Sequence, residues 1–331
     1  MSRKVKEGDR CVLYFVVPCY DEEKCLKETT RCLKKKISNL VRAKAISSES
    51  KIVYIDDGSR DKTWQLIEQM GDEVIGVKLS KNQGHQNALM AGLMYAKDHC
   101  DVAISMDADL QDDIDVVDDF LAEYKEGAEI VYGVRSERKK DSFFKKHTAL
   151  MFYWLMEKFG ANTVYNHADY RLMSKRALEE LANYREVNLF LRGIVPLIGL
   201  KTSVVKYKRA ERFAGESKYP FKKMMNFALD GITSFSVKPI RLVFCFGLIV
   251  FLISLAVLVY AFIMKIVGNV VSGWTFTICS IWLLGGVQMV AIGVIGEYIG
   301  KIYSEVKARP RYIIEKIKDG GKSDDEERGK K

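Results

Sequence analysis

Two aspartates, Asp107 and Asp109, stand one residue apart directly after an apolar run at residues 102–106. A short apolar run of this kind predicts a buried strand, so the pair stands where that strand ends. Divalent cations such as Mg2+ and Mn2+ prefer oxygen ligands and often bind through one or two carboxylates together with phosphates. Gln111 offers a further side-chain oxygen in the same segment. A solvated acidic loop is the alternative, but a second acidic strand end upstream favours a site for a metal that bridges a diphosphate.

That second acidic strand end is the Asp-Asp-Gly-Ser sequence at residues 56–59. Asp56 can accept hydrogen bonds from the base or ribose of a nucleotide. Pro18, Tyr20 and Glu22, which follow the first apolar run, can form walls of the same pocket. A simple turn is the alternative for the Asp-Gly-Ser part, since Asp and Gly favour turns.

Apolar runs alternate with amphipathic stretches through the first 135 residues. The expected strands cover residues 12–17 (ended by Pro18), 51–55, 74–79, 102–106 and 129–132, and the expected helices cover residues 21–40, 61–70, 85–97 and 114–126. This alternation predicts an α/β fold whose mostly parallel sheet has helices on both faces. Ligands of such sheets bind beyond the carboxyl ends of the strands, where the polar clusters stand. Residues 141–209 are less regular and more helical in pattern.

Two long apolar segments, residues 240–264 and 274–296, follow this region. The first contains one charge, Arg241, and the second contains none. At about 1.5 Å of rise per residue, each helix is long enough to cross a hydrocarbon core of about 30 Å. The connecting loop carries only Lys265, whereas Lys and Arg are frequent on both outer sides, so the positive-inside rule places both termini in the cytoplasm.

These segments divide the chain into four expected parts. They are a cytoplasmic catalytic domain (1–218), a juxtamembrane amphipathic helix (219–238), two transmembrane helices (239–298) and a basic cytoplasmic tail (299–331) that is disordered from Asp319. The amphipathic helix has an apolar stripe flanked by lysines, which suits a helix in the membrane interface. An ordinary helix that packs on the globular domain is the alternative.

The formal net charge of +9 suits nucleic acid, anionic lipid or phosphorylated substrates as partners. The two long apolar segments favour the last two, and no zinc-finger spacing or RNA-binding aromatic signature is present. The seven cysteines are scattered and form no Cys-x-x-Cys pair, which indicates a reducing compartment rather than a disulfide framework. No signal peptide is visible at the charged N-terminus.

Four motifs together resemble family 2 glycosyltransferases with the GT-A fold. Residues 18–22, Pro-Cys-Tyr-Asp-Glu, resemble the family's Pro-x-Tyr-Asn-Glu opening, with Asp21 in place of Asn. Residues 56–61 resemble the second motif, and residues 81–84 (Lys-Asn-Gln-Gly) resemble the third. Residues 107–112 resemble the metal motif of the branch that acts on polyprenyl phosphates, which includes bactoprenol glucosyltransferases and dolichol-phosphate mannose synthases.

The resemblance implies a GT-A, Rossmann-like sheet with a C-terminal two-helix transmembrane hairpin. It adds Asp57, Lys81 and Asp107 to the nucleotide-sugar site. The segment at residues 167–171 resembles the family segment whose Asp serves as the base, so Asp169 is the candidate base or an electrostatic positioner. Candidate ligands of the acceptor phosphate are Arg135, after the fifth strand, and Arg212, Ser217 and Lys218, in a segment that resembles the Arg-x-x-Gly-x-Ser-Lys loop of this branch.

The implied activity is inverting transfer of a hexose to polyprenyl (undecaprenyl) phosphate on the cytoplasmic face of the cell membrane, with Mg2+ or Mn2+. Glucose from UDP-glucose is the expected donor, and GDP-mannose, UDP-N-acetylglucosamine and UDP-galactose stay open. The expected protein is multi-pass and homo-oligomeric, because short hairpins often need partners to pack against. A processive polysaccharide synthase is disfavoured by the lack of a Gln-x-x-Arg-Trp segment, and a non-catalytic membrane scaffold is disfavoured by the intact Asp-x-Asp.

Overall fold

The computed structural model describes residues 10–135, 167–187, 189–208, 238–267, 273–320 and 322–323. The chain forms two compact units. The first, here called the sheet unit, comprises Met1–Leu150, Thr163–Tyr219 and Arg309–Lys331. The second, here called the hairpin unit, comprises Met151–Asn162 and Pro220–Ala308.

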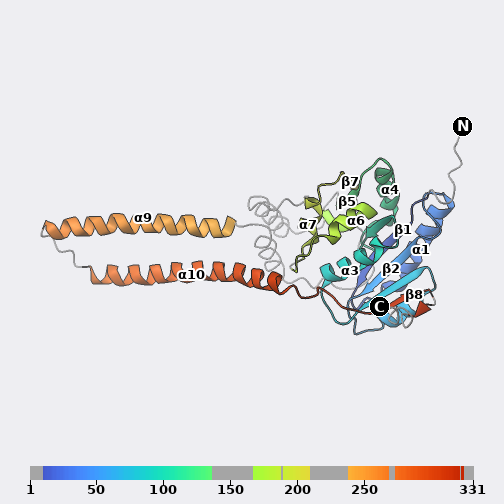
Figure 1. Ribbon diagram of the computed structural model, residues 1–331, viewed down its shortest axis with the longest axis horizontal. Coiled ribbons are helices and arrows are strands. Elements are labelled where there is room, and N and C mark those ends of the chain that lie inside the picture. Colours follow the sequence, from blue (N-terminus) through green and yellow to red (C-terminus); the bar gives the residue numbers. More distant parts are fainter. Residues whose placement is uncertain are drawn as a thin grey trace. The chain divides into compact units, whose positions relative to one another are not determined.

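A mixed sheet forms the centre of the sheet unit (Figure 1). Its strands in chain order are β1 (Leu13–Cys19), β2 (Lys51–Asp56), β3 (Val74–Leu79), β4 (Val102–Ser105), β5 (Ile130–Arg135), β6 (His167–Ser174), β7 (Thr202–Tyr207), β8 (Ile314–Asp319) and β9 (Lys322–Ser323). Within the described residues the sheet has nine strands in the order β7-β5-β6-β4-β1-β2-β3-β8-β9. Pairing is parallel for β1 with β2 and β4, for β2 with β3 and for β5 with β7, so the prediction of a mostly parallel sheet is confirmed.

Helices cover both faces of this sheet. They are α1 (Leu26–Arg42), α2 (Thr63–Glu68), α3 (His85–Lys97), the short 3-10 turn η2 (Ile114–Val116) with α4 (Val117–Lys125), α6 (Lys175–Ala182) and α7 (Leu191–Leu197). Leu33 of α1 and Phe120 of α4 share one buried cluster with Phe15 of β1. The opposite face receives α3, where a Cβ on Gly92 would lie 2.5 Å from a Val16 methyl group. The glycine therefore permits the close approach of α3 to the sheet.

Strand β1 continues through Pro18, which was expected to end it. Proline has no backbone N–H to donate and is therefore usually excluded from central strands. Here β4 pairs with β1 only as far as Val16, so no ladder bond to β4 needs an N–H at residue 18. The expectation that the strand ends before Pro18 is wrong for this reason.

Strand β6 lies between β4 and β5 and runs antiparallel to both. The prediction of an irregular, more helical region at residues 141–209 is wrong for β6 and β7. Because β6 is antiparallel to its neighbours, its amino end lies at the sheet edge at which β1, β2, β4 and β5 end, here called the carboxyl edge.

Strand β8 pairs antiparallel with β3, and β9 pairs with β8. The prediction of disorder from Asp319 is wrong for Asp319 and for residues 322–323, which form strands. Several contacts hold β8 in place. Lys316 pairs with Glu68 at 2.7 Å and Lys51 pairs with Asp319 at 2.8 Å.

The hairpin unit contains α9 (Lys238–Ile266) and α10 (Trp274–Lys307), which contact each other along the hairpin. Helix α10 extends well beyond residue 296, where the second expected span stops. Within the described residues one segment, Leu283–Lys307, is long and apolar enough to cross a membrane, with a mean hydropathy of 1.5. Residues 219–237, which make up nearly all of the expected juxtamembrane helix, lie outside the described residues.

Candidate active site

The loops that follow β1 and β2 are joined by reciprocal hydrogen bonds. The backbone N–H of Arg60 donates to the Asp21 carboxylate at 2.8 Å, and that of Asp21 donates to the Ser59 hydroxyl at 3.0 Å. Asp21 has a φ of 54°, a left-handed conformation that Asp and Asn adopt more readily than other non-glycine residues. Asp21 can therefore stand where the family motif has Asn without changing this loop.

Asp56 and Asp57 stand at the end of β2 and have different surroundings. Asp57 is bound to the next loop, since its two oxygens accept hydrogen bonds from the backbone N–H groups of Gln83 at 2.7 Å and Gly84 at 2.9 Å. Asp56 has no exposed surface, and its Oδ2 has no hydrogen-bond partner among the described residues. Burial raises the pKa of Asp56 above its usual value. A buried acceptor without a partner is rare in folded proteins and suits a ligand-binding group.

The loop with Lys81 packs closely on the turn at Gly58. Gly58 has a φ of 67°, and a Cβ at this position would lie 2.7 Å from the backbone N of Asn82. Only glycine fits this position without movement of the loop. The Lys81 side chain is exposed and Tyr20 is 38% exposed, so both are accessible at the carboxyl edge.

The loop at residues 107–112 follows β4. Leu110 has a φ of 56°, which turns the chain sharply, and the backbone N–H of Gln111 donates to the Asp109 carboxylate at 3.2 Å. Asp109 and Gln111 are buried, whereas the Asp107 side chain is 39% exposed. Within the described residues no group of three or more His, Cys, Asp or Glu side chains could hold a metal ion. The carboxylate oxygens of Asp107 and Asp109 are of the type that divalent cations prefer as ligands.

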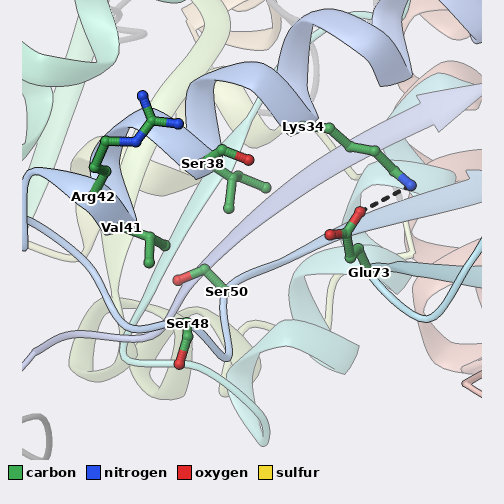
Figure 2. Close-up of a pocket in the computed structure, with 8 residues that line it drawn as sticks. Lys34, Ser38, Val41, Arg42, Ser48, Ser50 and Glu73 are labelled. Carbon is green, nitrogen blue, oxygen red and sulfur yellow. Dashed lines mark ion pairs between the residues drawn. The ribbon is translucent and has the colours of Figure 1, made fainter.

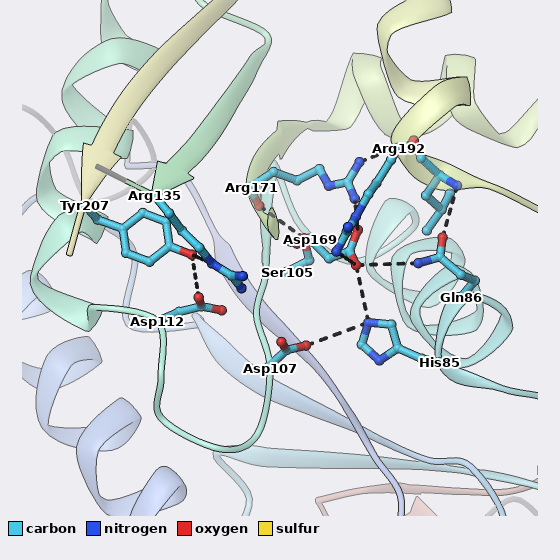
Figure 3. Close-up of polar contacts among 11 residues, drawn as sticks. His85, Gln86, Ser105, Asp107, Asp112, Arg135, Asp169, Arg171, Arg192 and Tyr207 are labelled. Atoms are coloured by element: carbon cyan, nitrogen blue, oxygen red, sulfur yellow. Dashed lines mark hydrogen bonds and ion pairs between the residues drawn. The ribbon is translucent and has the colours of Figure 1, made fainter. Parts of the chain in front are cut away.

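Asp169 lies at the amino end of β6, inside the strand rather than before it, and is surrounded by donors (Figure 3). Its carboxylate accepts from Arg171 at 2.7 Å and from Arg192 at 3.0 and 3.3 Å. The amide of Gln86 donates to it at 3.5 Å. Burial alone would raise the pKa of Asp169, but Arg192, His85 and Arg171 outweigh it and hold the pKa well below its usual value. The carboxylate is therefore ionised and a weak proton acceptor.

His85, the first residue of α3, lies between two acids. Its Nε2 is 3.7 Å from Asp107 and 3.7 Å from Asp169. Burial alone would lower the pKa of His85, but Asp169 and Asp107 outweigh it and raise the pKa. The imidazole thus connects the acid of the expected metal site with the acid of β6.

A second polar group lies at the ends of β5 and β7 (Figure 3). The Tyr207 hydroxyl donates to Asp112 at 2.6 Å and accepts from Arg135 at 3.3 Å. Burial, and then the charge of Asp107, raise the pKa of Asp112 to about 6. Arg135 thus lies near the acidic loop, as expected of a cation at this edge.

The structure brings most of the predicted residues to the carboxyl edge. They are Pro18, Tyr20, Glu22, Asp56, Asp57, Lys81, Asp107, Asp109, Gln111, Arg135 and Asp169. Arg212, Ser217 and Lys218 lie outside the described residues. Sequence reasoning missed His85, Gln86, Arg171, Arg192, Asp112 and Tyr207 as members of the site. His85 could have been predicted as a site residue, because it directly follows the third motif and begins a helix.

A surface pocket of about 320 Å³ lies elsewhere on the sheet unit, with Lys34, Arg42, Ser50 and Glu73 in its lining (Figure 2). Lys34 and Glu73 form an ion pair of 2.9 Å at this pocket. The Ser50 hydroxyl accepts a hydrogen bond from the backbone N–H of Leu13, where β1 begins. The pocket is therefore at the amino ends of the strands, opposite the acids described above.

This arrangement, acids at the carboxyl edge of a mostly parallel sheet followed by an apolar hairpin, agrees with two family models. Residues 14–182 match glycosyl transferase family 2, and residues 238–302 match the GtrB C-terminal hairpin. The chain belongs to glycosyl transferase family 2, and it is a transferase enzyme.

Similar proteins cover nearly the whole chain. An uncharacterized glycosyltransferase, YkoT of Bacillus subtilis, is 55% identical over 92% of this chain and 91% of its own length. The bactoprenol glucosyl transferase of Shigella phage SfII is 41% identical over 91% of this chain and 96% of its own length. Among solved structures, glucosyl-3-phosphoglycerate synthase of Mycobacterium tuberculosis covers 70% of this chain and 82% of its own, with a TM-score of 0.44 and 17% identity.

Proposed function

We propose that this enzyme transfers a hexose from a nucleotide diphosphate sugar to the phosphate of a polyprenyl lipid, with inversion at the anomeric carbon. The observation that carries this proposal is the pair of acids after β4, Asp107 and Asp109, at the same sheet edge as the buried Asp56 in a chain that also has the GtrB hairpin. The name of the 41% identical phage relative, bactoprenol glucosyl transferase, supports the lipid acceptor and glucose as the sugar.

The donor would bind across the ends of β1 and β2. The buried Oδ2 of Asp56, which has no hydrogen-bond partner among the described residues, would bind the base or ribose, and Tyr20 and Lys81 are exposed at the same sheet edge. Asp57 would act on the donor through the loop that it holds, because both of its oxygens bind backbone N–H groups of that loop. Pro18 and Glu22 complete the wall of this pocket.

Asp107, Asp109 and Gln111 would hold Mg2+ or Mn2+ together with the diphosphate oxygens. A bound cation would neutralise the leaving nucleoside diphosphate without proton transfer. Asp107 is the most accessible of these ligands, whereas Asp109 is buried and fixed by the backbone of Gln111.

A polyprenyl phosphate oxygen would form the new bond to the anomeric carbon while the bond from that carbon to the diphosphate breaks. This oxygen is already anionic near pH 7, because a phosphate monoester has a second pKa of about 6. The step therefore needs no strong base, and the low pKa of Asp169 favours a positioning role over a base role. Arg135, together with Arg212, Ser217 and Lys218, would bind the acceptor phosphate.

The finer parts of the proposal are UDP-glucose as donor, undecaprenyl phosphate as acceptor, a homo-oligomer, and a multi-pass position in the cell membrane with both termini cytoplasmic. Two helices of the hairpin unit and the bias of Lys and Arg toward the outer segments support this topology. A reagent that reacts only with cysteines exposed on the outer face, tested on single-cysteine variants in the 268–272 loop and at the C-terminus, would check it. Labelling of the terminus instead of the loop would contradict it.

The activity test uses the full chain in nanodiscs with a short-chain polyprenyl phosphate and a panel of UDP-glucose, UDP-galactose, UDP-N-acetylglucosamine and GDP-mannose. The expected product is a lipid-linked hexose, formed fastest from UDP-glucose. Asp109→Ala should lower turnover by about 100-fold or more, because metal stabilisation of the leaving group contributes several kcal/mol. Turnover that survives both this change and chelation would contradict the metal role, and lack of transfer from every donor would contradict the acceptor.

A further inference from the structure

We propose that Arg192 is a phosphate-binding residue of this active site and that Asp169 positions it. The inference deepens the proposed function and rests on it for the identity of the phosphate-bearing substrates. Arg192 is the second residue of α7, far in sequence from the four motifs. The fold brings the Arg192 side chain to Asp169, which is 23 residues away in the chain.

The contact between Arg192 and Asp169 has the geometry of a two-point ion pair. The Arg192 Nε lies 3.3 Å from one carboxylate oxygen of Asp169, and Nη2 lies 3.0 Å from the other (Figure 3). A pair of this kind fixes the plane of the guanidinium. Since the Nε side faces Asp169, the Nη1 side of the fork is directed away from it.

The start of α7 is also fixed, so Arg192 has little freedom to leave the site. The Leu191 backbone N–H donates to Gln86 at 3.0 Å, and its carbonyl accepts from Arg171 at 3.5 Å. Both partners also bind Asp169. A cation that is held in place before the ligand arrives loses little entropy on binding.

The carboxylate of Asp169 is shared by two arginines that differ in exposure. Arg171 has no exposed surface and forms a 2.7 Å ion pair with Asp169, so these two charges compensate each other. Arg192 adds a second positive charge, and its side chain is 30% exposed. Two guanidinium groups therefore share the carboxylate of Asp169, and that of Arg192 is the accessible one.

The position of Arg192 relative to the acids indicates which anion it meets. His85 bridges Asp169 and Asp107 with a distance of 3.7 Å to each, so Arg192 is two side chains away from the expected diphosphate site. Arginine is suited to phosphate because its planar fork matches two phosphate oxygens. That phosphate belongs either to the nucleotide donor or to the lipid acceptor.

The experiment uses the full chain in nanodiscs and compares Arg192→Ala and Arg192→Lys with the wild type. Arg176→Ala is the matched control, because Arg176 is exposed on α6 and lies 3.8 Å from Glu129 at the opposite end of β6. Three quantities are measured: the Kd of UDP with Mn2+ by calorimetry, kcat and KM for a short-chain polyprenyl phosphate, and the Tm.

We expect Arg192→Ala to weaken one phosphate ligand by about tenfold to a hundredfold, the usual effect of losing a charge-assisted hydrogen bond. A higher KM for polyprenyl phosphate with an unchanged Kd of UDP assigns the lipid phosphate, and a higher Kd of UDP assigns the donor. Arg192→Lys should give an intermediate loss, because lysine keeps the charge without the fork.

Unchanged values of both constants in Arg192→Ala, with a Tm close to that of Arg176→Ala, would overturn the proposal. If Arg192→Ala does not fold, Arg192→Lys tests the proposal in its place. An unchanged Kd of UDP together with an unchanged KM for polyprenyl phosphate in Arg192→Lys would then overturn the proposal. Failure of the proposed function can be distinguished from failure of the Arg192 proposal. It would appear as absence of lipid transfer in the wild type, and the Kd of UDP would then be the only test of Arg192.

Discussion

The carboxylate of Asp57 accepts a 2.9 Å hydrogen bond from the backbone N–H of Gly84, the residue directly before α3. The end of β2 thereby fixes the start of the helix that carries His85. We expect Asp57→Ala to lower the Tm and to reduce turnover by about tenfold or more, because each lost hydrogen bond to a buried charge costs about 1.5–3 kcal/mol. Thermal melting and initial rates of the full chain check this.

Asp98→Ala is the matched control for that change. Asp98 lies after the other end of α3 and its side chain is 63% exposed in a surface pair with Lys97. Surface pairs of this kind contribute little, so the control should resemble the wild type. Equal behaviour of the two variants would show that the Asp57 contact does not support the site.

Substitution of Asp56 should weaken ligand binding without a loss of stability. We expect Asp56→Asn to leave the Tm unchanged or higher while weakening UDP binding by about tenfold, because a buried carboxylate is costly to the free protein. Calorimetry with UDP and thermal melting check the two parts separately. The control is Asp61→Asn, whose carboxylate accepts from the backbone N–H groups of Glu23 at 3.1 Å and Thr63 at 2.9 Å.

Asp61→Asn should therefore lose stability, since an amide can replace only one of those two acceptors. A fall in Tm for Asp56→Asn as large as that of Asp61→Asn would contradict the assignment of Asp56 as a binding group. Unchanged UDP affinity would contradict it as well.

Asp169 gives a prediction about pH. Its folded pKa is well below the unfolded value of about 3.9. A lowered carboxylate pKa stabilises the fold above the unfolded pKa, and this contribution is lost as the pH falls through the folded pKa. The difference in Tm between the wild type and Asp169→Asn should therefore be full at pH 7 and shrink below about pH 4.

The same variant separates an active-site role of Asp169 from a purely structural one. If Asp169 positions Arg192 and His85, Asp169→Asn should lower turnover more than UDP binding, and the rate of the wild type should show no acid limb from Asp169 between pH 5 and 8. Equal losses in turnover and UDP binding would indicate a purely structural residue. A difference in Tm that grows toward acid pH would contradict the pKa direction.

Lys318 of β8 provides a test of the C-terminal strand. Its ammonium donates to the carbonyls of Gly71 at 3.2 Å and Val74 at 2.9 Å, which connect α2 to β3. We expect Lys318→Met to lower the Tm, because these carbonyls lose a charged donor that joins β8 to the segment before β3. Lys316→Met is the control. Lys316 is 53% exposed and pairs across the surface with Glu68, so a loss as large as that of Lys318→Met would contradict the role of these carbonyl contacts.

The elements with a clear apolar period were predictable from the sequence. Residues 74–79 and 85–97 form β3 and α3 as expected, and β4 ends one residue before the expected Met106. The carboxyl edge was predictable too, because parallel strands place their ends together and the acids stand at those ends. The positions of Asp56, Asp107 and Asp109 at this edge follow from the strand ends alone, with no knowledge of side-chain contacts.

Strand β6 was not predictable by the same reasoning, because it buries two charges. Asp169 and Arg171 are two residues apart and therefore share one face of the strand, where each compensates the other. A sequence pattern treats both as exposed and so obscures the strand. Arg192 was missed for a related reason, since its partner in space is 23 residues away in the chain.

Strand β8 covers the β3 edge of the sheet but follows both hairpin helices in the chain. During translation both hairpin helices are made before residues 314–319, so the β3 edge of the sheet stays open until the hairpin is complete. An open strand edge is a template for pairing with other chains. Residues 314–319 therefore close the β3 edge of the catalytic fold, and a chain truncated after the hairpin would be prone to aggregate even though every motif residue had been made.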